Sequence, residues 1–83
     1  MGEPIVILGA GGHGRVIADI IRAQGGNFLG FLDDHRQSAP GLTVLGAFSD
    51  AMGISMRAWF IIGVGDNAAR VELAARFAGI LRF

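Results

Sequence analysis

A glycine-rich stretch near the N-terminus carries the clearest chemical signal. Residues 9–14 read GAGGHG, and Gly9, Gly11 and Gly14 fit the pattern G-x-G-x-x-G. In that pattern the first glycine permits a tight turn after a strand, the second lets a phosphate approach the backbone, and the third lets a helix pack closely. A helix that begins here would direct its free N–H groups and its positive dipole end at the phosphate. We therefore predict a diphosphate-binding loop that includes Gly12, with a purely structural turn as the alternative.

The histidines allow two interpretations. His13 stands where such turns usually carry a small or apolar residue. Its ring could donate a hydrogen bond to a phosphate or sugar oxygen, most strongly when protonated, or it could simply be exposed to solvent. His35 is expected on a surface loop. Two histidines without a nearby ligand pattern do not predict a metal site, and we assign no catalytic residue in this chain.

Two adjacent aspartates form a second candidate site. Asp33 and Asp34 follow an apolar segment and lie about 20 positions after Gly14, where a Rossmann domain places a carboxylate on ribose hydroxyls. Because successive side chains of a strand point in opposite directions, we expect one aspartate to reach a ligand and the other to hold the loop. A solvated turn is the alternative.

A second glycine-rich segment follows the third strongly apolar run. Gly63 and Gly65 end this run, and Asn67 lies at the start of the last expected helix. In a Rossmann-like order this strand lies beside the first one, on the side away from the second. Both glycine-rich strand ends would then line one crevice at the topological switch point, where open α/β sheets bind ligands. The alternative is a simple strand-to-helix turn capped by Asp66.

Apolar patterning predicts the elements that position these residues. Residues 5–8 are continuously apolar, as in a strand buried on both faces. The expected strands cover residues 5–8, 28–32, 43–45 and 58–64, and the expected helices cover residues 15–24, 49–52 and 67–78. The direction of strand 43–45 stays open, because a short connection without a helix is tight for a parallel crossover. The alternation predicts an α/β fold: a small Rossmann-like three-layer domain with a mostly parallel four-stranded sheet, one domain over residues 1–83.

The same patterning predicts which side chains are buried. We expect the first long helix to bury Val16, Ile17, Ile20 and Ile21, and the last helix to bury Val71, Ala74, Ala75 and Ala78. Trp59 and Phe60 are expected in the core. Residues 80–83 look like the approach to a further strand, and Arg15 lies close enough to the glycine loop to meet a phosphate.

Composition excludes several function classes. The chain has 83 residues, equal numbers of basic and acidic residues, and no cysteine. A neutral balance argues against a nucleic-acid partner, and the lack of cysteine and lysine excludes disulfide, thiolate and Schiff-base chemistry. No apolar run reaches the roughly 20 residues of a membrane span, and no signal peptide is visible. We expect a cytoplasmic protein with no membrane partner.

Four segments together resemble a known family: IVILGAGGHGRVIADII, GFLDD, VLG and FIIGVGDNAAR. They are similar to the N-terminal domain of the PglD/NeuD-type sugar O- and N-acetyltransferases of the sialic acid, bacillosamine and perosamine pathways, over about residues 4–78. The resemblance implies a domain that binds a nucleotide-linked amino sugar, with a UDP or GDP moiety. It implies that Gly11, Gly12 and His13 lie against the diphosphate or sugar. It also implies that Asp33 and Asp34 face the nucleoside, and that Gly65 and Asn67 line the opposite wall.

The resemblance also implies what this chain lacks. In the family a left-handed β-helix of hexapeptide repeats follows, binds acetyl-CoA, forms the trimer and supplies the catalytic histidine. This chain contains no hexapeptide repeat. We therefore expect no cofactor in this domain, acetyl-CoA in a full-length enzyme, and a monomer or weak dimer for the 83 residues. Two other functions stay open: an NAD(P)-binding domain of an oxidoreductase, which normally needs two mononucleotide halves, and a non-catalytic interaction domain.

Overall fold

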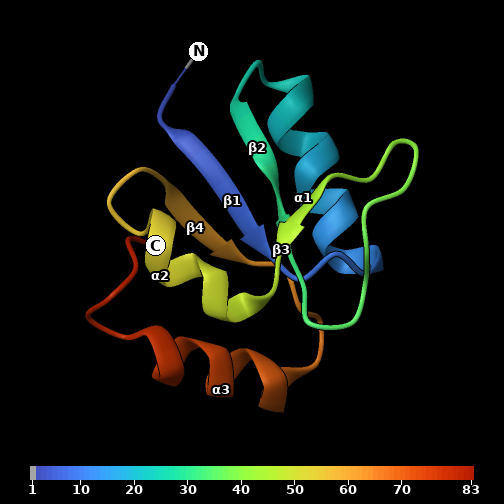
Figure 1. Ribbon diagram of the computed structural model, residues 1–83. Helices are drawn as coiled ribbons and strands as arrows, with labels where there is room; N and C mark the ends of the chain where they lie inside the picture. The colour runs from blue at the N-terminus through green and yellow to red at the C-terminus, as the bar shows by residue number, and fades with distance from the viewer. Residues whose placement is uncertain (1) are drawn as a thin grey trace.

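Four strands and four helical segments make up the described part of the chain. The computed structural model describes residues 2–83. Figure 1 shows the elements in the order β1 (Pro4–Leu8), α1 (Gly12–Ala23), β2 (Asn27–Leu32), β3 (Val44–Gly46), the 3-10 helix η1 (Phe48–Asp50), α2 (Ala51–Ile54), β4 (Trp59–Ile62) and α3 (Asn67–Phe77).

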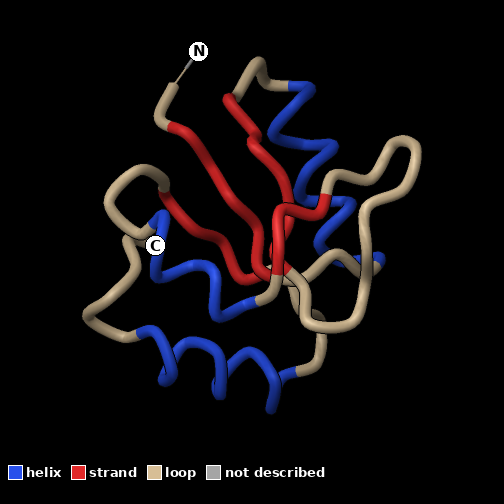
Figure 2. Tube along the Cα trace, viewed as in Figure 1, coloured by secondary structure: helices blue, strands red, loops and turns tan. Residues whose placement is uncertain are grey.

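The strands form one parallel sheet. Their order is β3-β2-β1-β4, and β1 pairs in parallel with both β2 and β4. The direction of β3, left open by the sequence, is also parallel. The long loop after β2, visible in Figure 2, returns the chain so that β3 can run in this direction. The Ser38 hydroxyl closes this loop by accepting the Val44 N–H at 2.8 Å and donating to the Val44 carbonyl at 2.9 Å. The predicted four-stranded α/β architecture is confirmed.

Helices cover both faces of the sheet, as Figure 1 shows. Ile7 of β1 packs with Ala18 and Ile21 of α1 on one face. Val6 and Leu8 point to the other face, where the core includes Leu73 and Phe77 of α3. This alternation explains why β1 is apolar at every inner position: both of its faces are buried.

The predicted inner face of α1 is wrong at two of its four positions. Val16 is 58% exposed and Ile20 is 52% exposed, whereas Ile21 is 8% exposed. The helix begins at Gly12, and its buried residues are Gly14, Ala18 and Ile21. These follow the spacing i, i+4, i+7, so the helix approaches the sheet through two small residues. The prediction followed the large apolar side chains and therefore rotated the helix.

The predicted inner face of α3 is also wrong. Its buried residues are Leu73 and Phe77, one turn apart. The four residues expected inside are all exposed: Val71, Ala74, Ala75 and Ala78. Two large side chains at i and i+4 bury more apolar area than a row of alanines, and this decides which side of the helix faces the sheet.

A third correction concerns Trp59 in the edge strand β4. Phe60 is buried as predicted, but Trp59 is 37% exposed at the start of this edge strand, with the Arg82 guanidinium 4.9 Å from its ring centre. Arg82 also forms a parallel bridge with Trp59, and its carbonyl accepts the Phe60 N–H at 2.7 Å. Residues 80–83 thus approach the sheet edge in the direction of a further strand.

Within residues 2–83, no helix is long and apolar enough to cross a membrane.

Candidate ligand-binding site

The two glycine-rich strand ends meet at one edge of the sheet. The Gly63 N–H donates to the Leu8 carbonyl at 2.8 Å, which extends the β1–β4 pairing past the end of β4. A Cβ atom added to Gly63 would lie 2.8 Å from the Cα of Gly14. The loop after β1 and the loop after β4 are therefore in backbone contact. They meet at the switch point of the sheet, because α1 follows β1 onto one face and α3 follows β4 onto the other.

The motif glycines divide into two groups. Gly9 has a φ of +109°, and a Cβ at Gly14 would overlap the carbonyl oxygen of Gly9. These two positions, together with Gly63, require glycine for the close packing of backbone on backbone. In contrast, nothing lies within 4 Å of a Cβ added to Gly12, and only the Arg36 side chain approaches one added to Gly11. Gly12 thus leaves a bare surface, and Gly11 leaves one that only the Arg36 side chain approaches.

The bare surface is the N-terminus of α1. Gly11 is the N-cap residue, has an extended backbone, and provides no side-chain cap. The first turn contains no acidic residue that would neutralise the positive end of the helix dipole. Main-chain N–H groups at such an end lack helical acceptors. This arrangement is suited to a phosphate or another anion.

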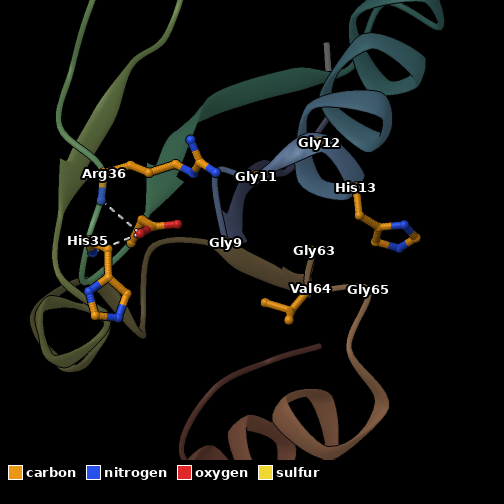
Figure 3. A pocket seen from close by; sticks show the side chains of 10 residues that line it. Gly9, Gly11, Gly12, His13, His35, Arg36, Gly63, Val64 and Gly65 are labelled. Carbon is orange, nitrogen blue, oxygen red and sulfur yellow. Dashed lines mark hydrogen bonds between the residues drawn. The ribbon is translucent and has the colours of Figure 1, made fainter.

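A cleft of about 520 Å³ opens over this helix end, which is in the size range of small-molecule sites. Figure 3 shows its lining: Gly9, Gly11, Gly12, His13, Asp33, His35, Arg36, Gly63, Val64 and Gly65. The structure therefore brings most of the predicted site residues together. Three of them lie outside the lining: Gly14 is buried beneath the loop, while Asp34 and Asn67 are exposed nearby.

Asp33 ties the two sides of this cleft together. Its Oδ2 accepts the Ala10 N–H at 2.8 Å, and its Oδ1 accepts the N–H groups of His35 at 2.8 Å and Arg36 at 2.9 Å. Burial by itself would raise the pKa of Asp33. The three N–H donors and the Arg36 charge outweigh burial and hold the pKa below its ordinary value. Asp33 is thus an ionised brace between the glycine loop and the loop after β2.

Asp34 also binds the main chain. Its Oδ1 accepts the Phe48 N–H at 2.8 Å and so holds the start of η1. Asp34 lines two smaller cavities of about 360 and 330 Å³ that adjoin the main cleft through Asp33 and His35. Both aspartates therefore hold loops, and a contact of either one with a ligand remains a prediction.

Other polar residues near the site are structural. Asp66 caps α3 as predicted, because its Oδ2 accepts the Ala69 N–H at 2.9 Å. Arg15, expected close enough to the glycine loop to meet a phosphate, lies outside the cleft lining, and its Nε donates to the Ala10 carbonyl of that loop at 3.1 Å. Within residues 2–83, no group of three or more histidine or acidic side chains is arranged to hold a metal ion.

A match over nearly the whole chain identifies the family. Residues 4–77 match the family model of the PglD N-terminal domain. The chain belongs to this family. No curated protein matches it, but solved structures do.

Two of these structures are of acetyltransferases. This PglD N-terminal domain is 31% identical to the acetyltransferase domain of PglB from Neisseria gonorrhoeae, solved with acetyl coenzyme A, with a TM-score of 0.82 over 95% of this chain. It is 26% identical to a mutant perosamine N-acetyltransferase from Caulobacter crescentus, solved with CoA and GDP-perosamine, with a TM-score of 0.75 over 92% of this chain. The domain spans only 40% and 37% of those two chains.

Sequence reasoning missed three residues that line the cleft in this PglD N-terminal domain: Val64, Arg36, and His35, which was expected only as a surface residue. A partial signal for Arg36 was available, because an aspartate three residues earlier often folds the chain into a turn through its carboxylate. The position of the guanidinium over Gly11 depends on the tertiary structure, and no local pattern predicts it.

Proposed function

We propose that this PglD N-terminal domain binds a nucleotide-linked amino sugar, with a UDP or GDP moiety, as the substrate-binding part of a sugar acetyltransferase. The observation that carries the proposal is the bare N-terminus of α1 in the cleft between the ends of β1 and β4. A diphosphate is the anionic centre of every nucleoside diphosphate sugar, and this surface suits it.

The cleft suggests how the ligand lies. In our proposal the diphosphate sits over Gly11 and Gly12, and the nucleoside extends toward the loop that Asp33 and Asp34 hold. The two smaller cavities lie on that side. The sugar extends the other way, toward His13 and Gly65, which are neighbours across the cleft. Asn67, one residue beyond that wall, contributes only if the bound ligand reaches past Gly65.

Acetyl-CoA belongs, in our proposal, to the part of a full-length enzyme that this chain does not span. That part would also supply the catalytic residue and a trimer interface, while the 83 residues alone form a monomer or weak dimer. We assign no catalytic role to His13 or to any other residue of this chain. A cytoplasmic location, one domain over the whole chain, and the lack of nucleic-acid and membrane partners stay predictions from the sequence.

Calorimetric titration tests the proposal. UDP-N-acetylglucosamine and GDP-mannose serve as probes, and NAD⁺ serves as the comparison ligand. We expect heat of binding with at least one sugar nucleotide and none with NAD⁺, since the sheet contains a single mononucleotide-binding half. No heat and no change in amide chemical shifts at millimolar sugar nucleotide would refute the proposal. Tight NAD⁺ binding alone would favour an oxidoreductase domain, and self-association without any ligand binding would favour an interaction domain.

A further inference from the structure

Arg36 has a fixed backbone beside the glycine loop. Its N–H donates to Asp33 Oδ1 at 2.9 Å, while Asp33 Oδ2 accepts the Ala10 N–H at 2.8 Å. One carboxylate therefore holds the backbone of Arg36 and the backbone of the loop at a set separation. The position of the arginine relative to Gly11 is thus built into the fold.

The side chain of Arg36 extends over that loop. A Cβ added to Gly11 would lie 3.9 Å from Arg36 Nη2 and 4.0 Å from Nε. Figure 3 shows the guanidinium beside Gly11, at the opposite side of the loop from the His13 ring. Within residues 2–83 this guanidinium forms neither a hydrogen bond nor an ion pair, and its charge acts only at longer range, where it helps to lower the pKa of Asp33.

Four of the other six arginines have side-chain contacts that occupy them, and the remaining two, Arg57 and Arg70, lie outside the cleft lining. Arg15 donates to the Ala10 carbonyl, and Arg22 pairs with Asp19 at 3.6 Å. Arg76 and Arg82 lie over the rings of Phe77 and Trp59. In the described chain, Arg36 is the arginine that lines the cleft.

We infer that Arg36 contacts the diphosphate of the ligand and holds it against the N-terminus of α1. The helix end supplies only partial charges, whereas a guanidinium supplies a full charge and a planar set of donors that matches phosphate oxygens. The two groups would grip the diphosphate from two sides. In dinucleotide domains an arginine near the acidic residue can instead accommodate a ribose 2′-phosphate. Here the guanidinium lies over Gly11, at the phosphate loop itself, and this favours the diphosphate. The inference rests on the proposed function and adds the residue that supplies its positive charge.

Matched substitutions test the inference. R36Q removes the charge and keeps a polar but shorter side chain, whereas R36K keeps a charge at nearly the original reach without the planar fork. R57Q is the control, because Arg57 is exposed and precedes β4, at the end of the sheet opposite the cleft. Affinities for UDP, GDP and the nucleosides uridine and guanosine are measured by calorimetry for each variant. Thermal unfolding checks that all of them are folded.

We expect R36Q to weaken the binding of UDP and GDP by roughly tenfold or more, as the loss of a charge-assisted hydrogen bond implies. R36K should fall between R36Q and the wild type, and R57Q should match the wild type.

The nucleosides should bind R36Q and the wild type equally, because they carry no phosphate. An equal loss of affinity for nucleosides and nucleotides would show a merely structural role and overturn the inference. If the wild type binds UDP or GDP and R36Q binds it within twofold, the inference fails while the proposed function stands. If the wild type binds no nucleotide at all, the proposed function fails, and the inference fails with it.

Discussion

At the scale of single residues, Asp33 connects the two loops that line one side of the cleft. Its two carboxylate oxygens accept three main-chain N–H groups from two different loops. The sequence predicted that one residue of the aspartate pair would hold a loop, but the pairing partners are long-range contacts that no local pattern contains. The brace has a consequence for acid stability.

Asp33→Asn should lower the free energy of unfolding by about 1 to 2 kcal/mol at pH 7, because one acceptor oxygen and the charge are lost. Since the folded pKa of Asp33 is lowered, its stabilising contribution is complete above the ordinary aspartate pKa of about 3.9. The stabilising contribution is lost as the pH falls from there through the folded pKa.

Urea unfolding at pH 7 and below pH 4 measures this contribution. The difference in free energy of unfolding between the variant and the wild type should shrink in acid. Asp19→Asn, at an exposed position of α1, is the control, and a difference independent of pH would contradict the account.

The glycines allow a second prediction at this scale. Gly12→Ala should leave the fold intact, because nothing lies within 4 Å of the added Cβ. It should nevertheless weaken nucleotide binding about tenfold, since the methyl group occupies the surface proposed for the diphosphate. Gly53→Ala, whose Cβ is equally free of contacts and far from the cleft, should leave the affinity unchanged. Calorimetry on both variants checks this. Equal affinities for Gly12→Ala and the wild type would mean that the loop is purely structural.

Gly14→Ala should behave differently. Its Cβ would overlap the Gly9 carbonyl oxygen, and both groups are backbone that cannot move without separating α1 from β1. We expect a loss of about 3 kcal/mol or more in the free energy of unfolding, at the upper end of overpacking effects. Thermal and urea unfolding measure it, with Gly12→Ala as the matched control. A stability equal to that of the control would contradict the assigned packing.

At the scale of elements, the sequence located the helices and strands well and oriented two helices incorrectly. Continuous apolar runs, with glycines marking where each run ends, suffice to place β1, β2, β4 and the helices between them. Orientation failed where burial was assigned by side-chain size alone on α1, and where alanines were preferred over Leu73 and Phe77 on α3. Whether a small residue faces a sheet depends on how closely two backbones approach, and periodicity alone does not contain that distance.

Two neighbouring isoleucines of α1 test this orientation. Ile21→Ala should cost about 2 to 5 kcal/mol in the free energy of unfolding, as for other large-to-small core substitutions. Ile20→Ala should cost less than about 1 kcal/mol, because Ile20 is 52% exposed. Urea unfolding of both variants provides the comparison. Equal losses would restore the helix face predicted from the sequence.

At the scale of the whole molecule, the fold class and the meeting of the two glycine-rich loops were predictable, because parallel strands place their C-terminal ends at one edge. The direction of β3 and the part played by Arg36 were not. Both depend on the course of the long loop after β2, which has few apolar residues and is shaped by side-chain bonds such as those of Ser38 and Asp33.

A small domain of this kind should gain measurable stability from its ligand. A sugar nucleotide present at 100 times its Kd stabilises a folded protein by about 2.7 kcal/mol. For a domain of this size, that corresponds to a rise of about 10 °C or more in Tm. Thermal unfolding with increasing UDP-N-acetylglucosamine or GDP-mannose should show this rise, and NAD⁺ at the same concentrations should not. A Tm that does not change with any nucleotide would count against a nucleotide site.

The contact of Gly9, Gly14 and Gly63 is main chain against main chain, beneath one wall of the cleft. In the proposed function this wall meets the diphosphate, which all nucleoside diphosphate sugars share, because backbone packing there leaves no room for new side chains. The adjoining cavity from Asp33 to Ala47 is lined mostly by residues that carry side chains. Under the same proposal, discrimination between one nucleobase and another falls to that cavity, and a change of substrate among relatives should be recorded in the loop after β2.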